Sequence, residues 1–308
     1  MKVRAILLFV CAVGLIGMSM TPALAVEPVA VVVTDATETG PAATDTYLAW
    51  MVQRVGRHTF HSNVWVQPLD GGTATRINPP GTTAFTGAIY GTTLAYELDD
   101  ETGADIVFYD LVAQVEIEVP EGVNTNFLEF SPRLSGTNLM FVRVRRHSSS
   151  VILFDMAAST STVLYTKANT DRRFFVVIPD QVNGNYATWS QIAVGPKGVR
   201  GGDVWLHDIS NGTTSKVPNT AGTWQYGSSV DSAGTVYFGR SNLNCGETAQ
   251  VIERRLDGTE TLLYDLPDGR DFRSTYAVDR PGGSTDVYID EGNCAGKDNG
   301  DILRLEGI

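Results

Sequence analysis

The hydrophobic pattern of this chain repeats six times, at intervals of about 45 to 50 residues. Each repeat opens with a hydrophobic triplet, and a polar loop of variable length separates the triplet from a second hydrophobic segment. Beyond residue 25 no segment keeps the 3.6-residue period of an amphipathic helix, so the pattern predicts short strands and almost no helix. The triplets are Leu48-Ala49-Trp50, Leu94-Ala95-Tyr96, Leu139-Met140-Phe141, Tyr186-Ala187-Thr188, Val236-Tyr237-Phe238 and Val287-Tyr288-Ile289, and the second segments start at Val64, Ile106, Val151, Val204, Val251 and Ile302.

Each repeat resolves into four short strands, which we call A to D; the two segments above are B and C. Strand A precedes B across a turn that usually contains glycine. Strand D follows C across a tight turn such as Asn211-Gly212 or Asp257-Gly258, dipeptides that suit two-residue hairpins. A ring of such antiparallel units is a β-propeller, in which neighbouring units bury each other's faces. The sequence therefore predicts an all-β fold, a six-bladed β-propeller with strand A nearest the axis.

The two ends of the chain complement each other in this scheme. The sixth repeat stops at Leu305, directly after its strand C, and has no strand D of its own. The hydrophobic run Val29-Ala30-Val31-Val32-Val33 belongs to no other repeat. We therefore expect this N-terminal strand to complete the last blade and close the ring, which removes exposed strand edges.

One repeat carries a recognisable turn motif. Phe130-Ser131-Pro132-Arg133-Leu134-Ser135-Gly136 precedes a strand B, and Ile152-Leu153-Phe154-Asp155 has the form of a strand C that ends in Asp. In these features the chain resembles the TolB-like six-bladed propellers and the related propeller repeats of prolyl oligopeptidase-type proteins. The resemblance implies the fold, and it places Ser131-Pro132 in the turn between strands A and B. It does not imply peptidase activity, because the sequence contains no G-x-S-x-G motif.

Residues 1–25 have the organisation of a secretory signal peptide. Lys2 and Arg4 precede an apolar run too short to span a bilayer, and Ala23-Leu24-Ala25 is the small-x-small pattern of a cleavage site. We expect residues 26–308 to form a single propeller domain that is exported to the periplasm or the extracellular space. No later segment is apolar enough to cross a membrane.

The chain is acidic, with a net charge of −12 that becomes −14 when the two signal cations are removed. An acidic chain without a dominant basic run argues against nucleic-acid binding, which requires neutralisation of phosphates. The acidity is typical of a protein that is soluble outside the cell. We expect an exported monomer without a cofactor.

Two cysteines remain after signal removal, Cys245 and Cys294. They occupy the same loop of consecutive repeats, and an even pair in an exported protein favours a disulfide. The alternative is two free thiols. The spacing does not indicate zinc, because no second Cys or His lies close to either one.

The loops between strands B and C differ sharply from repeat to repeat. In a propeller these loops lie on the same face as the D–A loops, around the mouth of the channel, where binding residues tend to gather. Two of them are basic, and the loop of the second repeat between them is acidic. The basic loops hold Arg54, Arg57, His58 and His61 in repeat one and Arg143, Arg145, Arg146 and His147 in repeat three; the acidic loop holds Glu97, Asp99, Asp100, Glu101 and Asp105.

These charged loops have three interpretations. Arginine forks in both basic loops can hold a carboxylate, sulfate or phosphate, which makes Arg54, Arg57, His58, His61, Arg145, Arg146 and His147 a candidate ligand-binding set. The three histidines can instead be read as metal ligands. The third interpretation is that long polar loops collect charges, which pair with the acidic loop as weak surface salt bridges.

Two further sets of residues recur from repeat to repeat. Asp110, Asp155 and Asp208 end strand C and are interpreted as caps of the following turn. Phe127, Phe174, Trp224 and Phe272 recur where strand A begins, and we interpret them as wedges between blades, or else as a binding rim.

The sequence thus supports two hypotheses of different class. The first is an exported, non-enzymatic propeller that binds a protein, peptide or cell-envelope ligand through the face with the B–C and D–A loops. The alternative is a propeller-type hydrolase or lyase that acts on a glycan or an anionic substrate at the channel mouth. A glycoside hydrolase would need two carboxyl groups about 5 to 9 Å apart there.

Overall fold

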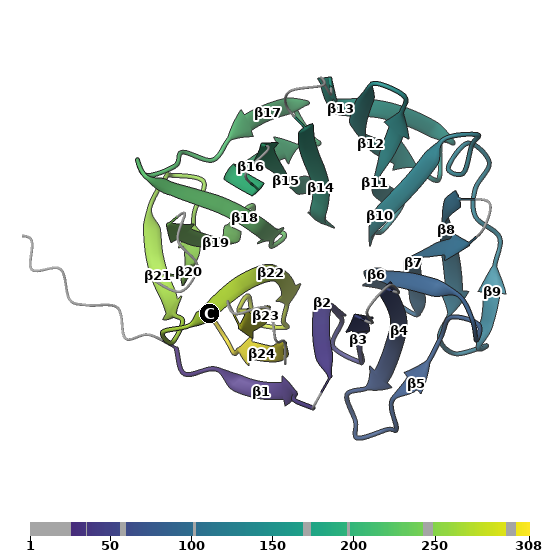
Figure 1. Ribbon diagram of the computed structural model, residues 1–308, viewed down its shortest axis with the longest axis horizontal. Helices are drawn as coiled ribbons and strands as arrows, with labels where there is room; N and C mark the ends of the chain where they lie inside the picture. Colours follow the sequence, from purple (N-terminus) through teal and green to yellow (C-terminus); the bar gives the residue numbers. More distant parts are fainter. Residues whose placement is uncertain are drawn as a thin grey trace, which may run out of the picture.

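The computed structural model describes residues 26–34, 36–55, 60–100, 103–168, 174–195, 198–242, 249–293 and 300–308. Within these ranges the regular secondary structure consists of β-strands. The strands form six antiparallel sheets of four, placed as blades around a central axis (Figure 1). The predicted six-bladed β-propeller is therefore confirmed.

Each blade follows the chain from the axis outward, so strands A, B, C and D are consecutive in sequence. The sixth blade differs, because its fourth strand is β1 from the start of the chain. The strands are β1 (Val29–Val32); β2 (Thr37–Ala43), β3 (Tyr47–Val55), β4 (Phe60–Pro68) and β5 (Thr75–Arg76) in blade one; β6 (Thr83–Tyr90), β7 (Thr93–Asp100), β8 (Gly103–Asp110) and β9 (Val115–Ile117) in blade two; β10 (Leu128–Ser135), β11 (Asn138–Arg145), β12 (Ser148–Asp155) and β13 (Thr160–Ala168) in blade three; β14 (Phe174–Asn183), β15 (Tyr186–Gly195), β16 (Gly198–Asp208) and β17 (Thr213–Lys216) in blade four; β18 (Thr223–Val230), β19 (Val236–Asn242), β20 (Ala249–Arg254) and β21 (Glu260–Asp265) in blade five; and β22 (Arg270–Asp279), β23 (Thr285–Asn293) and β24 (Asp301–Leu305) in blade six.

Strand β1 lies along the outer edge of β24. The two strands are antiparallel, with Val29 opposite Arg304 and Val32 opposite Ile302. Val32 is buried in the largest hydrophobic cluster, together with residues of blades one, two, three and six. The contribution of this pairing to closure of the ring stays a prediction.

Strand B supplies one large buried aromatic ring to every blade. These rings are at most 5% exposed, and the strand-B segments around them are almost wholly buried because each blade is covered by two neighbours. The six rings are those of Trp50, Tyr96, Phe141, Trp189, Phe238 and Tyr288.

Strand A is bulged in all six blades, and the bulges alternate in form around the ring. In blades one, three and five, two residues bulge, and the first has a positive φ: Gly40 (62°), Ser131 (53°) and Gly227 (60°). In blades two, four and six a single residue bulges. Bulges increase the local twist of a strand.

The backbone N–H of each two-residue bulge is donated to a side chain on strand B of the preceding blade. Gly40 donates to Asp290 (3.1 Å), Ser131 to Glu97 (3.1 Å) and Gly227 to Ser190 (2.9 Å). Residues on strand B therefore connect blade six to one, two to three, and four to five. Hydrogen bonds of this type therefore occur at every second blade junction.

In the turn motif of the third repeat, Ser131-Pro132 does not lie where the resemblance implied. Ser131-Pro132 forms the bulge inside β10, and the turn between strands A and B comes later, at Gly136 with a φ of 59°. The prediction that the pair belongs to the turn was wrong. The physical reason is that Pro132 has no N–H for the ladder, which an unpaired bulge position tolerates.

The Asp residues at the ends of strand C act as predicted. In each case one carboxylate oxygen accepts the N–H groups of the residues two and three positions later. Asp110 accepts from Val112 and Ala113, both at 2.8 Å, and Asp155 and Asp208 repeat the arrangement. These Asp residues recur because each of them caps the same kind of turn, which is a structural role.

Candidate functional site: the seam between blades two and three

Because the four strands of a blade alternate in direction, the B–C and D–A loops share one face and the A–B and C–D turns the other. On the first face a cavity of about 440 Å³ lies at the seam between blades two and three. It is bounded on one side by the start of β8 and on the other by the segment that enters blade three. Its lining residues are Gly103, Ala104, Asp105, Thr125, Asn126, Phe127, Leu128 and Val144.

An ion pair between Glu129 and Arg143 anchors the segment that enters blade three. The Glu129 carboxylate, fully buried, accepts Nε of Arg143 at 2.6 Å and both the N–H and Oγ1 of Thr125, at 3.1 and 2.6 Å. Nη2 of Arg143 donates to the carbonyl oxygens of Gly122 and Val123. Arg143 is therefore a structural residue, and the carboxylate it neutralises fixes the loop above it.

The loop so fixed presents two apolar side chains to solvent. Phe127 is 44% exposed and Leu128 46%. The guanidinium of Arg145 lies over the Phe127 ring, 5.1 Å from its centroid, a cation–π contact worth about 0.5–1 kcal/mol at an exposed site. Across the seam, Gly103 allows the close approach, since a Cβ there would lie 3.2 Å from Leu128. An aromatic and an aliphatic side chain thus line one cavity, and a cation lies over the aromatic ring.

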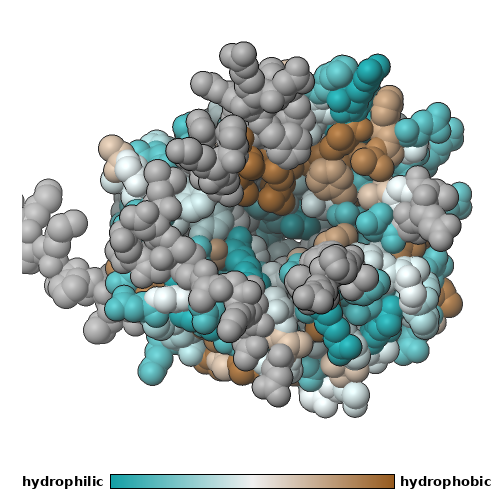
Figure 2. All heavy atoms as spheres, viewed as in Figure 1, coloured by the Kyte–Doolittle hydropathy of each residue, from teal (hydrophilic) through white to brown (hydrophobic). Residues whose placement is uncertain are grey.

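Of the aromatic residues that recur at the start of strand A, one acts as a wedge between blades and another lies at the rim. Phe272 is buried and packs on Tyr226 with ring centroids 5.5 Å apart, as a wedge between blades. Phe127 remains exposed at the rim. Figure 2 shows hydrophobic surface (brown) over blades three and four, around the hollow centre of the ring.

The structure places the sequence-predicted ligand residues on two separate hairpins. Arg54 and His61 oppose each other at the end of the β3–β4 hairpin, and both are exposed. Arg145, Arg146 and His147 are exposed at the end of the β11–β12 hairpin. Blade two lies between the two hairpins. Arg57, His58, Cys245 and Cys294 lie outside the described residues.

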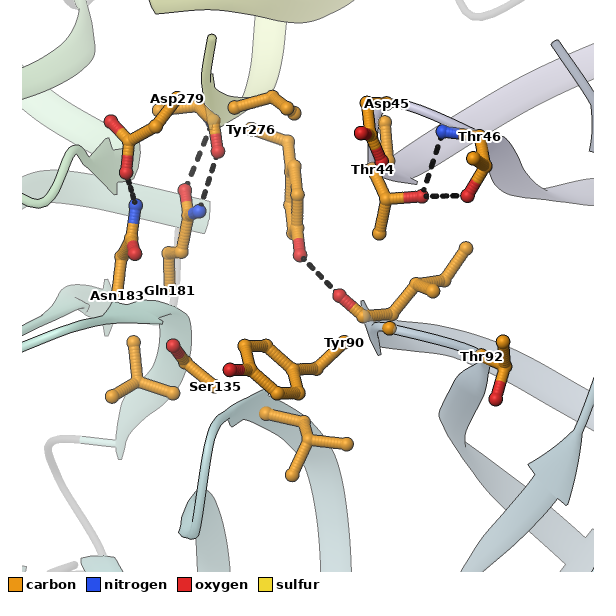
Figure 3. A pocket seen from close by; sticks show the side chains of 17 residues that line it. Thr44, Asp45, Thr46, Tyr90, Thr92, Ser135, Gln181, Asn183, Tyr276 and Asp279 are labelled. Carbon is orange, nitrogen blue, oxygen red and sulfur yellow. Dashed lines mark hydrogen bonds between the residues drawn. The ribbon is translucent and has the colours of Figure 1, made fainter. Parts of the chain in front are cut away.

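The opposite mouth of the channel holds a second cavity, of about 430 Å³, which the sequence did not indicate. Figure 3 shows Gln181 hydrogen-bonded to both backbone groups of Ala277, and Tyr276 donating to the Ile89 carbonyl at 3.5 Å. At the rim Asn183 donates to Asp279 at 2.9 Å. These residues come from A–B turns and the ends of inner strands, whose polar side chains look like ordinary turn residues in the sequence.

Three carboxyl groups near the axis have perturbed acidity. Burial raises the pKa of Glu97 to about 7 and those of Asp180 and Asp290 to about 6, because desolvation disfavours the charged forms. Each accepts a hydrogen bond from an N–H at or beside the bulge of the following blade. Their positions tie them to the blade junctions rather than to a shared site.

The described residues show neither a cluster of three metal-ligating side chains nor a helix that would cross a membrane. The histidines His61 and His147 are on different blades. The structure thus offers no support for the metal interpretation among the residues it describes.

The chain resembles known proteins in fold alone. No protein-family model and no curated protein sequence matches it. Among solved structures, a putative TolB from Agrobacterium tumefaciens has a TM-score of 0.57 at 12% identity, covering 88% of this chain and 91% of that one. The fold is that of the TolB-like six-bladed propellers.

Two further structures have longer chains than this one. The Pyrococcus horikoshii acylaminoacyl peptidase has a TM-score of 0.51 at 15% identity, and the match covers 90% of this chain but 48% of the peptidase. TolB from Acinetobacter baumannii matches with a TM-score of 0.48 at 11% identity over 80% of this chain. The match spans 60% of that TolB.

Proposed function

We propose that this protein is an exported, non-enzymatic binding scaffold that recognises a peptide segment of a protein partner at the seam between blades two and three. The observation that carries the proposal is the juxtaposition of the exposed Phe127 and Leu128 with the guanidinium of Arg145 beside a cavity. Scattered apolar side chains are common on surfaces, but two that are adjacent, rigidly held and capped by a cation favour recognition.

The chemistry of the seam defines the peptide. An aliphatic or aromatic side chain would lie on Phe127 and Leu128, and a neighbouring carboxylate would bind Arg145, Arg146 or His147. Arginine suits this role because its planar fork binds carboxylates through two hydrogen bonds. The basic hairpin of blade one, with Arg54 and His61, extends the same face beyond blade two and would contact a longer partner.

The rigidity of the loop supports binding rather than catalysis. Glu129 and Arg143 fix the loop before any ligand arrives, which lowers the entropy cost of association. The seam offers no paired nucleophile and base among its lining residues.

Selection from a random peptide library displayed on phage tests the proposal, with the chain from Val26 as bait. We expect enrichment of peptides with a carboxylate next to an aromatic or aliphatic residue. Arg145→Glu and Phe127→Ala should each weaken the selected peptides at least tenfold, while Arg304→Gln, on the outer part of blade six, should leave them unchanged. Selected peptides whose binding is indifferent to both seam variants would refute the proposal.

The alternative function is a hydrolase or lyase that acts on a glycan or anionic substrate at a channel mouth. The cavity at the A–B mouth, with Asp45 and Asp279 in its lining, is the feature that favours it. Incubation with anionic glycans and chromatography of the products tests this alternative. Turnover that Asp279→Asn abolishes and Arg145→Glu leaves intact would establish it in place of the seam.

A further inference from the structure

One arginine lies in the inner layer of the ring. Arg133, on β10 directly after the bulge, donates Nε to the Asp180 carbonyl at 2.5 Å. Its Nη1 donates to the carbonyls of Gly87, at 3.1 Å, and Pro132, at 2.9 Å. All three carbonyls belong to the bulges of three consecutive blades. The guanidinium is therefore held in place by backbone alone.

The carboxylates of Asp180 and Glu97 accept hydrogen bonds from groups other than Arg133. Asp180 Oδ2 accepts from the Oγ atoms of Ser190 and Ser228, both at 2.6 Å, and Glu97 accepts the N–H of Ser131. Among the described residues no carboxylate forms an ion pair with Arg133, whose bonds within this part of the chain are those to the three carbonyls.

The charge of Arg133 is thus poorly compensated. Burial lowers the pKa of the guanidinium, because desolvation disfavours a cation without a paired anion. The raised pKa of Glu97, about 7, means that this carboxyl group is only partly ionised near neutral pH. A buried cation in this position favours an anion that comes from outside the protein.

The geometry leaves one edge of the guanidinium available for that anion. Nη2 of Arg133 has no hydrogen-bond partner among the described residues, yet it is not one of the buried unpartnered atoms, and the side chain as a whole is partly exposed. Arg133 is followed in β10 by Leu134 and Ser135, which line the cavity of Figure 3. Nη2 is therefore accessible to solvent, and the three carbonyls that hold the guanidinium lie on the innermost strands of blades two, three and four, which border the axis.

We propose that Arg133 binds a small oxyanion, either a carboxylate or an inorganic anion such as sulfate, in the central channel. The bulge carbonyls accept the N–H of Nε and both N–H groups of Nη1, so the guanidinium offers the two N–H groups of Nη2 to the ligand. Hydrogen bonds from such a charged donor to an oxyanion are stronger than those between neutral groups. This site lies near the axis and is independent of the seam between blades two and three.

Equilibrium dialysis with radiolabelled sulfate at constant ionic strength tests the site in the chain from Val26. We expect one saturable site per chain in the unsubstituted protein, and affinity at least tenfold lower in Arg133→Gln. Arg76→Gln is the matched control, because Arg76 also donates to a carbonyl, that of Pro79, but lies on the outermost strand of blade one; it should bind as the unsubstituted protein does. No saturable site, or equal affinity in Arg133→Gln, would overturn the proposal.

Competition with N-acetylglycine separates the two sources of anion. Displacement of sulfate identifies a peptide carboxylate as an acceptable ligand, and failure to displace it restricts the site to inorganic oxyanions. This competition is meaningful once dialysis has shown that sulfate binds. Because Arg133→Gln can fail to fold, the unsubstituted protein supplies a second readout. Crystals soaked in selenate, which has the shape and charge of sulfate, should show an anomalous selenium peak for an anion hydrogen-bonded to Nη2, and a channel without that peak would refute the proposal.

Discussion

At the scale of single residues, polar side chains of the interior accept the backbone N–H groups that the bulges leave out of the sheets. Glu97 and Ser190 sit at corresponding places on strand B and differ in chemistry, yet each accepts the N–H of a bulge in the next blade. In a low-dielectric interior an unsatisfied N–H would cost more than the buried acceptor does. A carboxyl group in this role carries a pH dependence that a serine does not.

Glu97→Gln should make the protein less sensitive to pH. The pKa of Glu97 in the folded chain, about 7, lies above the ordinary value of 4.5, so folding favours the protonated form. Its contribution to stability is complete below about pH 4.5 and is lost as pH rises through about 7. The neutral amide keeps the acceptor for Ser131. We expect the free energy of unfolding of the variant, relative to the parent, to rise by about 2–3 kcal/mol between pH 5 and pH 8.

Urea unfolding at a series of pH values measures this difference. Asp180 and Asp290 titrate in both proteins, so their effects cancel in the comparison. Glu118→Gln, at an exposed position after β9, is the control and should follow the parent at every pH. Parallel stability curves for Glu97→Gln and the parent would show that the carboxyl does not titrate in this range.

At the scale of strands, the sequence predicted the elements well and their irregularities poorly. Hydrophobic triplets and Asn-Gly or Asp-Gly turns act locally, so the positions of strands B, C and D could be read from neighbouring residues. The bulges of strand A could not. Gly40, Ser131 and Gly227 adopt positive φ because a side chain of a different blade accepts their N–H groups, and that partner is distant in sequence.

The role of β1 can be tested with adjacent valines. Val32 is 7% exposed and packs in the core, whereas Val33, which follows the strand, is 59% exposed. Val32→Asp should destabilise the protein by about 2–4 kcal/mol, because it buries an unpaired carboxyl group where an apolar side chain packed. Val33→Asp should change stability by less than about 0.5 kcal/mol.

Urea unfolding and size-exclusion chromatography of the two variants provide the measurements. If β1 closes the ring, Val32→Asp should also increase self-association, because the freed edge of β24 is a template for pairing. Equal stability of the two variants, with both monomeric, would show that the propeller does not depend on β1.

At the scale of the whole molecule, the repeat predicted the ring but only part of the candidate site. Arg145, Arg146 and His147 stood out as a basic loop in an acidic chain, and the structure places Arg145 over the ring of Phe127, which lines the seam cavity. In the sequence Phe127 looked like Phe272, which is buried, because the burial of an aromatic at the start of strand A depends on how closely the next blade approaches. Arg133 gave no signal, since its environment comes from the bulges of three blades.

The predicted bridge between Cys245 and Cys294 bears on the integrity of the ring. A disulfide across roughly 50 residues would restrict the unfolded chain and stabilise the folded one by about 4 kcal/mol. It would also join blade five to blade six, the blade in which the two ends of the chain meet. We therefore expect the chain from Val26, produced with export, to have no free thiol under denaturing conditions and to melt at a lower temperature after reduction.

Thiol titration and thermal unfolding with and without reductant make the comparison. The double variant Cys245→Ser/Cys294→Ser should melt at the temperature of the reduced parent and should not respond to reductant, which separates loss of the bridge from other effects of the reagent. Each single variant should expose one free thiol. Two titratable thiols in the exported parent, or a melting temperature indifferent to reduction, would contradict a stabilising bridge and leave hydrogen bonds and packing as the contacts between blades five and six.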